Sequence, residues 1–322
     1  MGMATMSSGL SRREMLTAAG LACGTGFLTA GAAAAAASAR ERSKPFGFSL
    51  NTSTIREQKV GIVREVEIAA AAGYDAIEPW MGTLDEYIKG GGSLNDLRKR
   101  IADFGLTVES AIGFAQWIVD DEAARKSGLE QARRDMDILA QIDGKRIAAP
   151  PVGAHDKPGP DLAVVAARYR ALLELGDQTG IVPQVEVWGF SKTLSRLGET
   201  VYVAVESGHP KACILPDVYH LYKGGSSFNG LKLLSGGAVQ VFHLNDYPPD
   251  PPRDAITDAH RVYPGDGIAP LKQALRDLRL AGFHGFLSLE LFNRDYWKQE
   301  PLAVAKTGLE KMKAVVAQSL EA

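Results

Sequence analysis

The feature of this sequence that most constrains its fold is a regular alternation of two kinds of segment from residue 45 onward. Short apolar or β-branched runs, typical of buried strands, alternate with longer segments of helical periodicity. The predicted strands are eight in number and lie at 46–51, 74–80, 106–113, 146–151, 183–189, 212–220, 239–246 and 285–292. The predicted helices lie at 56–72, 95–104, 122–141, 162–179, 194–207, 270–281 and 301–320. This alternation is typical of a parallel sheet covered by helices.

The number of strand–helix units favours one closed barrel. Eight units in roughly 280 residues match a (β/α)₈ TIM barrel, and helix-ending glycines stand shortly before several predicted strands. A doubly wound sheet is the main alternative, but it usually has a glycine-rich turn after its first strand, and "SLNTSTIREQ" has none. No linker divides the chain beyond its N-terminal segment. We therefore predict the α/β class, with a single TIM barrel over residues 40–322.

The N-terminus has the pattern of an export signal. Arg12 and Arg13 precede about twenty apolar or small residues without a charge, which is typical of a twin-arginine signal peptide. Alanine-rich A-x-A cleavage sites follow, so we predict a signal peptide over residues 1–39 and a periplasmic or otherwise exported protein. A retained membrane anchor is the alternative. After cleavage Cys213 is the only cysteine, which excludes an intramolecular disulfide.

The charge balance narrows the class of partner. The chain has 36 basic and 38 acidic residues and a formal net charge of −2. The basic residues form no stripe and do not interleave with aromatic residues, so neither nucleic acid nor an acidic membrane is predicted as the main partner. Contact with a membrane is expected only through the export signal, and the sequence makes no prediction of oligomeric state. A small molecule is the expected partner.

Several predicted strands end in a polar residue, at the end of a parallel barrel that faces the active site. These residues are Glu78, Glu186, Asp217, His220, His243, Asp246 and Glu290. Each alone has an ordinary explanation, such as an ion pair with a neighbour. Glu186, Asp217, His243 and Glu290 come from four consecutive strands, however, and must converge. Such crowded carboxylates raise one another's pKa unless a cation neutralises them, so we predict a divalent metal.

The ligand types narrow the choice of metal. Three carboxylates with one imidazole favour Mn²⁺, Mg²⁺ or Co²⁺, and Zn²⁺ is also compatible. Cys213 stands too early on its strand to join the set.

Four short motifs around these residues resemble the xylose isomerase-like TIM barrels, a family of sugar isomerases and epimerases. They are "VEVWG" with Glu186, "DVYH" with Asp217 and His220, "FHLND" with His243, and "LSLELF" with Glu290, in the family's order. The resemblance covers the chain after its predicted signal. By likeness to the ketose 3-epimerase branch, it implies that Glu186, Asp217, His243 and Glu290 bind the metal. It also implies that the two glutamates move the proton and that His220 contacts the substrate.

Endonucleases of the endonuclease IV type share this barrel and provide a contrast. They bind three zinc ions and carry histidines on the second and third strands and a D-x-H pair after the seventh. Asp258 and His260 mimic that pair, but neither of those two strands ends in a histidine here. A trinuclear zinc site is therefore not predicted.

The expected chemistry follows from the two glutamates. A sugar with adjacent carbonyl and hydroxyl groups can lose a proton to a carboxylate while a metal polarises the carbonyl. Glu186 and Glu290 would then move the proton through a cis-enediolate, giving an epimer or an isomer. A lyase or dehydratase that acts on a keto-sugar or 3-keto-glycoside is the alternative, because the same intermediate can eliminate a neighbouring group. The third reading is a sugar-binding barrel without catalysis.

The remaining predictions concern substrate contacts. Arg261 stands in a long proline-rich loop, 247–267, which we expect to form a wall or lid of the site. Glu78 and the rings of Trp80 and Trp188 are expected to contact the sugar, with packing of the barrel rim as the alternative for the rings. Two further aromatic residues carry the same two readings, Trp117 and Tyr219. Asn245 and Asp246 end the seventh predicted strand. We expect them to support the ring of His243 or the loop that follows.

Overall fold

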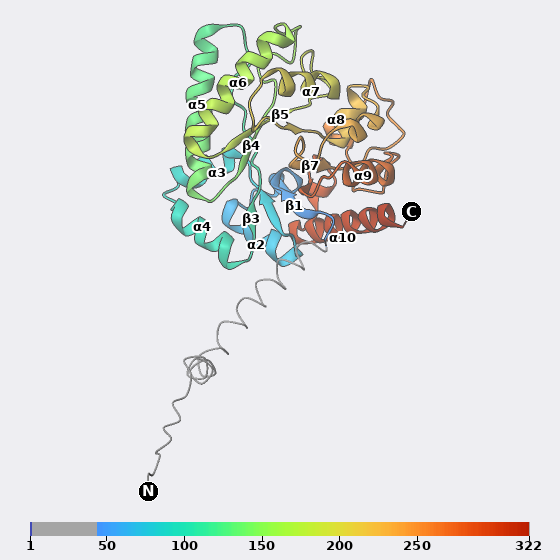
Figure 1. The fold of residues 1–322 in the computed structure, drawn as a ribbon. Helices are drawn as coiled ribbons and strands as arrows, with labels where there is room; N and C mark the ends of the chain where they lie inside the picture. Colours follow the sequence, from blue (N-terminus) through green and yellow to red (C-terminus); the bar gives the residue numbers. More distant parts are fainter. Residues whose placement is uncertain (2–43, 322) are drawn as a thin grey trace. The chain divides into compact units, whose positions relative to one another are not determined.

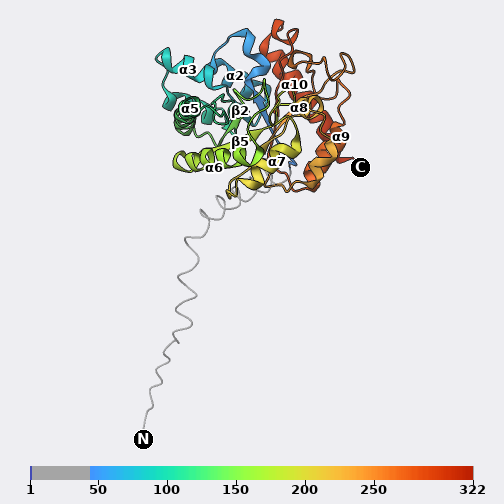
Figure 2. The same cartoon turned by 90° about the horizontal axis from the view of Figure 1, so that it is seen from above.

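The computed structural model describes residue 1 and residues 44–321, and residues 46–321 form a TIM barrel (Figure 1). Its strands are β1 (Gly47–Asn51), β2 (Ala76–Glu78), β3 (Thr107–Val108), β4 (Arg146–Ala149), β5 (Val182–Glu186), β6 (Ile214–Leu215), β7 (Val241–Leu244) and β8 (Phe286–Leu289). All paired strands are parallel. The helices surround these strands in both views (Figures 1 and 2). This architecture confirms the predicted fold class.

The strands form two sheets that are joined at both seams. One has the order β3-β2-β1-β8-β7 and the other the order β4-β5-β6. Parallel bridges pair Ile214 with Val239 and Asp217 with His243 at one seam. At the other, the Ala111 amide donates to the Arg146 carbonyl (3.1 Å). Strand pairing is therefore continuous around the barrel, and the carboxyl ends of the strands meet at one end of it.

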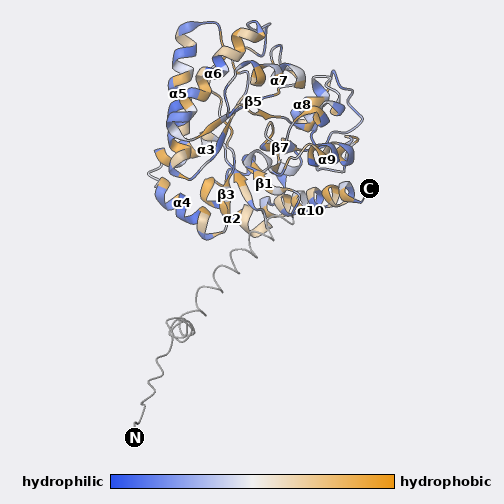
Figure 3. Ribbon diagram, viewed as in Figure 1, coloured by the Kyte–Doolittle hydropathy of each residue, from blue (hydrophilic) through white to orange (hydrophobic). Residues whose placement is uncertain are grey.

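The helices pack with their apolar faces toward the strands. They are α2 (Ile62–Ala72), α3 (Met81–Lys89), α4 (Leu94–Asp103), α5 (Glu122–Gln141), α6 (Leu162–Thr179), α7 (Leu197–Glu206), α8 (Val218–Lys223), α9 (Leu271–Leu280) and α10 (Pro301–Leu320). Four 3₁₀ helices complete the fold: η1 (Thr52–Gln58), η2 (Phe228–Leu233), η3 (Asp258–His260) and η4 (Tyr296–Lys298). Several outer helices have hydrophilic residues on one side and hydrophobic residues on the other (Figure 3). Apolar burial of this kind contributes about 25 cal/mol per Å².

The first predicted helix, 56–72, is wrong in its N-terminal part. Residues Thr52–Gln58 form η1 instead, and α2 begins only at Ile62. Lys59 has a left-handed backbone (φ 51°) and Gly61 has φ 76°, so the chain turns between the two helices. Apolar periodicity continues across this turn, which is why the sequence reads as one helix.

The sixth predicted strand, 212–220, is too long. The strand ends at Leu215, and Asp217 is the N-cap of α8, where its Oδ1 accepts from the amide of His220 (2.8 Å). His220 therefore lies in the first turn of a helix and not on a strand. A carboxylate N-cap followed by a short apolar helix has the same composition as a strand end, which explains the error.

The predicted signal peptide lies outside the residues that the structure describes. Within the described part, no helix combines the length and the apolar character that crossing a membrane requires. Cys213 is buried and unpaired.

Candidate active site

A cavity of about 210 Å³ opens at the carboxyl ends of the strands. Its lining residues are Trp80, Ile112, Phe114, Glu186, Trp188, Phe190, His220, Asp258, Arg261, Glu290 and Phe292. Six of the nine predicted site residues are among them. The other three, Glu78, Asp217 and His243, are fully buried. Asp217 pairs with Arg261 and His243 with Glu290, both of which line the cavity, whereas Glu78 is joined to Glu290 indirectly, through Asn51.

Three of the four predicted metal ligands form a compact group. Asp217, His243 and Glu290 each offer one ligand atom, and these atoms all lie within 4.8 Å of one another. They come from three adjacent segments, the start of α8, strand β7 and the residue after β8. Glu186, at the end of β5, lines the same cavity but is not part of this group.

The ring of His243 is held between two carboxylates. Its Nε2 lies 3.1 Å from Glu78 Oε2, and its Nδ1 lies 3.2 Å from Glu290 Oε2 without the geometry of a hydrogen bond. Glu78 Oε2 also accepts from Ser288 Oγ (2.6 Å) and from Asn51 Nδ2 (2.9 Å). Glu78 thus holds the ring of His243 in place. The sequence predicted that Glu78 contacts the substrate, but Glu78 does not line the cavity.

Arg261 reaches into this group from the loop after β7. Its Nη1 donates to Asp217 Oδ2 (2.9 Å) and Glu290 Oε2 (2.8 Å), and its Nη2 donates to Asp258 Oδ1 (2.6 Å) and His220 Nε2 (3.1 Å). Only 1% of the residue is exposed, and Nε has no hydrogen-bond partner among the described residues. The sequence predicted that Arg261 contacts the substrate. In the structure Arg261 lines the cavity and also donates to the carboxylates of Asp217 and Glu290.

The two glutamates predicted to move the proton have opposite pKa shifts. Burial raises the pKa of Glu186 well above its ordinary value, and the negative charges of Glu290 and Asp217 add to this effect. Burial also opposes ionisation of Glu290, but the positive charges of His243 and Arg261 outweigh it and hold its pKa well below the ordinary range. These shifts favour the protonated form of Glu186 and the ionised form of Glu290. Such a divergence is typical of acid and base partners.

His220 is a neutral hydrogen-bonding group at the edge of the cavity. Burial lowers the pKa of this imidazole to about 3. Its Nε2 accepts from Arg261, which places the proton on Nδ1, and Nδ1 has no hydrogen-bond partner among the described residues. The structure therefore leaves one donor available beside the two glutamates.

The side chains that surround Asp217, His243 and Glu290 fit a divalent cation. Two carboxylates and one imidazole are ordinary ligands of such ions, and His243 Nδ1 is a buried ring nitrogen without a hydrogen-bond partner. Glu78 and Glu290 outweigh the burial of His243 and raise its pKa well above the ordinary value, so cation binding at this ring must release a proton. Glu78 orients that ring, as supporting carboxylates commonly do in metal sites.

Aromatic rings form the wall of the cavity. Trp80 lies 5.1 Å from Phe114 and 5.9 Å from Phe292, measured between ring centroids. Trp188 lies 5.1 Å from Phe190. Trp80 and Trp188 thus stand where they were predicted, at the cavity.

For the two other rings the structure agrees with the alternative reading, packing of the barrel rim, because neither ring lines the cavity. Trp117 is buried away from it and donates from Nε1 to the Pro150 carbonyl (2.9 Å). Tyr219 is buried in α8 and packs against the Arg261 guanidinium (4.6 Å). Both rings are core residues of the barrel rim.

Of the two polar residues after β7, one contacts the site and the other contacts the loop. Asn245 Nδ2 donates to Asp217 Oδ2 (2.8 Å) and so orients that carboxylate. Asp246 faces the loop, where its side chain accepts from the amides of Gly265, Gly267 and Ala269 at 2.9–3.1 Å. Gly267 lies so close that a Cβ there would stand 2.3 Å from Asp246 Oδ1.

Sequence reasoning missed Asn51, although it has the signal used for the other residues. It ends the apolar run of β1 and donates from Nδ2 to both Glu78 and Glu290 (2.9 and 3.1 Å). Asp258 was considered only as part of a D-x-H pair. The sequence analysis also missed three rings of the wall, Phe114, Phe190 and Phe292.

Comparison with known proteins decides the family. A sequence profile described as "Xylose isomerase-like TIM barrel" matches residues 66–315. The chain belongs to the xylose isomerase-like TIM barrel family. This confirms the family that the four motifs indicated.

Relatives within the xylose isomerase-like family carry related enzymatic names. An inosose isomerase of Bacillus velezensis is 26% identical over 273 residues, 83% of this chain and 96% of that protein. A 3-dehydroshikimate dehydratase of Pseudomonas aeruginosa is 24% identical over 253 residues, 77% of this chain but 39% of that protein. Sugar epimerases are also among the relatives.

Comparison with solved structures confirms the fold. A crystal structure of the IOLI protein, described as having a binding zinc atom, superposes with a TM-score of 0.80 and 21% identity. It covers 86% of this chain and 100% of that one. The chain is thus similar over its whole barrel to a family of sugar isomerases, epimerases and dehydratases.

Proposed function

We propose that this protein is a divalent-cation-dependent isomerase or epimerase of a sugar or sugar derivative. One observation carries the proposal: Glu186 and Glu290 line the same cavity with pKa values shifted in opposite directions. The shifts favour the protonated form of Glu186, as a proton donor, and the ionised form of Glu290, as a proton acceptor. The names of the inosose isomerase and the sugar epimerases among the relatives support this reaction class.

Asp217, His243 and Glu290 would hold the cation. Glu186, which the sequence also predicted as a ligand, lies outside this compact group, and we assign it the role of proton donor. When bound, a divalent ion there would polarise a carbonyl oxygen and so make the neighbouring C–H bond more acidic. Mn²⁺, Mg²⁺ and Co²⁺ suit the carboxylate-rich set, and the zinc of the similar IOLI structure supports a site of this type.

Glu290, as the ionised partner, takes the proton from the carbon next to the carbonyl. Glu186, as the protonated partner, returns a proton to the resulting cis-enediolate. Return to the same carbon from the other face gives an epimer, and return to the former carbonyl carbon gives an isomer. His220 Nδ1–H and the Arg261 guanidinium would hold substrate oxygens, because both have an unpaired N–H beside the two glutamates.

Elimination is the second candidate reaction. The same intermediate can expel a hydroxyl group or a glycosidic oxygen, with the protonated Glu186 as the donor to the leaving group. The 3-dehydroshikimate dehydratase among the relatives supports this alternative. A barrel that only binds sugar finds no support among the relatives named above, which are enzymes by name.

The proposal is tested by Glu186→Gln, because Glu186 lies outside the compact ligand group. We expect turnover to fall by about 10²–10⁴-fold, the usual contribution of a general acid or base. Mn²⁺ binding measured by calorimetry should persist, since Asp217, His243 and Glu290 remain. Glu310→Gln, on the exposed side of α10, is the matched control. Turnover of the Glu186 variant near that of the control would contradict the assigned role.

We also propose that the chain is exported by the twin-arginine route. The support is the pair Arg12 and Arg13 before an uncharged apolar run. In a bacterial host with this pathway, the wild-type protein should appear in the periplasmic fraction. Replacing both arginines by lysine should retain it in the cytoplasmic fraction. An equal distribution of the two proteins would contradict the proposal.

A further inference from the structure

A second cavity of about 390 Å³ lies beside the active-site cavity. It is lined by Arg56, Glu57, Lys59, Gly61, Glu65, Trp80, Gly82, Thr83 and Glu86. These residues belong to the segments that follow β1 and β2, so the cavity opens at the same end of the barrel as the active site. Trp80 lines both cavities. Trp80 is thus a wall that the two cavities have in common.

Glu65 is an unusual lining residue because it is buried without a partner. Only 3% of it is exposed, and its Oε2 has no hydrogen-bond partner among the described residues. Burial, reinforced by the charge of Glu86, raises its pKa to about 8. Native proteins pair nearly all of their buried polar atoms, so such an atom at a cavity calls for an explanation. A ligand that hydrogen bonds to this carboxyl group would provide one.

The rest of the lining combines hydrogen-bonding groups with an aromatic face. Thr83 contributes a hydroxyl group and Lys59 an ammonium group. The Arg56 guanidinium lies 4.5 Å from the centroid of the Trp80 ring. Polyhydroxylated rings suit such a lining, because their C–H faces pack on aromatic rings while their hydroxyl groups reach polar side chains. By contrast, the smaller active-site cavity has a wall of aromatic rings and carries its polar groups together at the carboxylates.

Trp80 also connects the second cavity to the catalytic glutamate. Its Nε1 donates to Asn51 Oδ1 (2.9 Å), and Asn51 Nδ2 donates to Glu290 Oε1 (3.1 Å). A group that packs on Trp80 therefore contacts a ring that is two hydrogen bonds away from the predicted base. Binding energy from this remote group can then serve the reaction as well as affinity.

We propose that the second cavity binds a sugar or polyol unit that is joined by a glycosidic bond to the reacting ring. The inference rests on the proposed function, because it names the substrate class of the same site: a glycoside and not a free monosaccharide. The Glu65 carboxyl and the Thr83 hydroxyl bind hydroxyl groups of this second unit. Trp80 lies between the two units.

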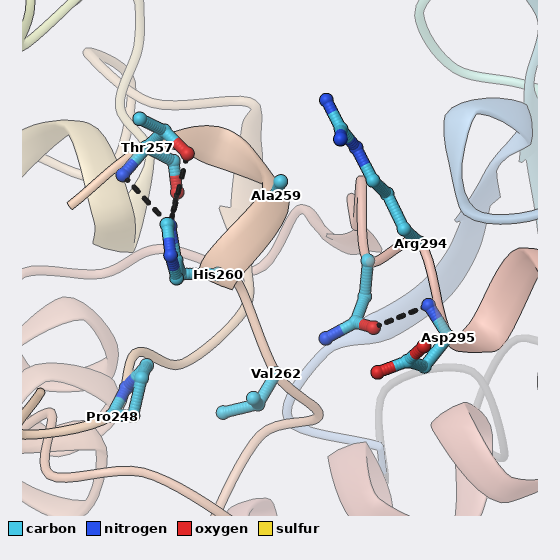
Figure 4. A pocket seen from close by; sticks show the side chains of 8 residues that line it. Pro248, Thr257, Ala259, His260, Val262, Arg294 and Asp295 are labelled. Carbon is cyan, nitrogen blue, oxygen red and sulfur yellow. Dashed lines mark hydrogen bonds between the residues drawn. The ribbon is translucent and has the colours of Figure 1, made fainter. Parts of the chain in front are cut away.

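A third cavity provides the matched control. It has a volume of about 470 Å³ and lies between the loop after β7 and the segment after β8, where it is lined in part by His260, Arg294 and Asp295 (Figure 4). It shares no lining residue with the active-site cavity. His260 is hydrogen bonded within its own segment, to Thr257.

The test is calorimetric binding of glucose and of four glucose disaccharides to the Mn²⁺-loaded protein. The disaccharides carry α-1,4, β-1,4, β-1,3 and α,α-1,1 linkages. At least one should bind about tenfold more tightly than glucose. Glu65→Leu and the nearly isosteric Thr83→Val should each reduce this preference, whereas Arg294→Ala should retain it. The Thr83 variant keeps the test valid if the Glu65 variant does not fold.

Two results would overturn the inference: no disaccharide binds better than glucose, or the preference survives both substitutions in folded protein. Failure of the proposed function would look different. In that case the disaccharide preference would depend on Glu65 and Thr83, but no sugar would undergo proton exchange or turnover. If a free monosaccharide exchanged its proton and no disaccharide competed with it for binding, the sugar-binding role of the second cavity would be contradicted. The proposed reaction class would be unaffected.

Discussion

At the scale of single residues, the site depends on how its buried charges are paired with one another. His243 lies between Glu78 and Glu290, and Arg261 lies between Asp217 and Glu290. All five are buried, so removing one charge leaves its partner uncompensated. Supporting residues should therefore matter almost as much as the cation ligands themselves.

Glu78→Gln tests this dependence. Glutamine keeps the size of the side chain and can still accept from His243 Nε2, but it removes the negative charge that supports the ring. We expect cation affinity to fall by about 10–100-fold, the usual effect of losing a supporting carboxylate. Calorimetric titration with Mn²⁺ measures this, with Glu310→Gln as the control. Unchanged affinity in the Glu78 variant would show that the carboxylate does not support the ring electrostatically.

Glu65 makes the stability of the fold depend on pH. The folded protein keeps this proton up to about pH 8, whereas an ordinary glutamate releases it near 4.5. The folded state therefore binds more protons between these values, and the free energy of unfolding must fall as the pH rises through this window. The full effect is a few kcal/mol, at about 1.4 kcal/mol per pKa unit.

Glu65→Gln should remove this contribution. Urea unfolding at a series of pH values from 5 to 9 should show the variant gaining stability relative to wild type as the pH rises. The exposed Glu310→Gln should follow wild type throughout. Parallel curves for wild type and the Glu65 variant would mean that the folded protein does not hold this proton.

At the scale of elements, the loop after β7 is held by one carboxylate. Asp246 accepts from four backbone amides, three of them in the loop 247–267 and the fourth that of Ala269. Its own backbone pairs with Val262 in both directions (2.9 and 3.0 Å). Arg261 is the neighbour of Val262, so this anchor also fixes the guanidinium in the site. The long proline-rich loop is consequently an ordered wall of the active site.

Asp246→Asn should loosen this wall. The amide nitrogen of asparagine cannot accept a hydrogen bond, so at least one of the three loop amides loses its partner. We expect a loss of about 1–3 kcal/mol in the free energy of unfolding and faster proteolytic cleavage within residues 247–267. Asp254→Asn, at a side chain that is 97% exposed, is the control. Equal cleavage rates would show that Asp246 does not order the loop.

Local sequence patterns predict some elements better than others. Apolar runs locate the eight strands because strand burial in a barrel is continuous along each run. The same signal overlooks α3 and extends the sixth strand through α8, because both helices are short and begin directly after a strand. Neither has room for a repeated helical period, so only the tertiary structure distinguishes them from strand ends.

At the scale of the whole molecule, the barrel explains which part of the site was predictable. Glu186, Asp217, His243 and Glu290 lie at or near the carboxyl ends of consecutive strands, so closing the barrel brings them to the same end of it. Three of them form the compact ligand group, and Glu186 lines the adjoining cavity. Asn51 satisfies the same rule and was overlooked.

Other features depend on contacts between distant segments. The position of Arg261 among the carboxylates is set by the path of a 21-residue loop. The wall of aromatic rings combines residues from the segments after four different strands, β2, β3, β5 and β8. No local pattern in the sequence encodes such an assembly. The cavity next to Trp80 likewise exists only once the segments after β1 and β2 have packed together.

Proton exchange at carbon is the most direct test of the central claim. The Mn²⁺-loaded protein is incubated in D₂O with inososes, ketoses and keto-glycosides, and deuterium at the carbon next to the carbonyl is followed by NMR. We predict incorporation with at least one substrate, its loss when the cation is chelated, and its loss in Glu186→Gln. No incorporation with any of these substrates, in folded protein that binds the cation, would contradict the proposed isomerase or epimerase.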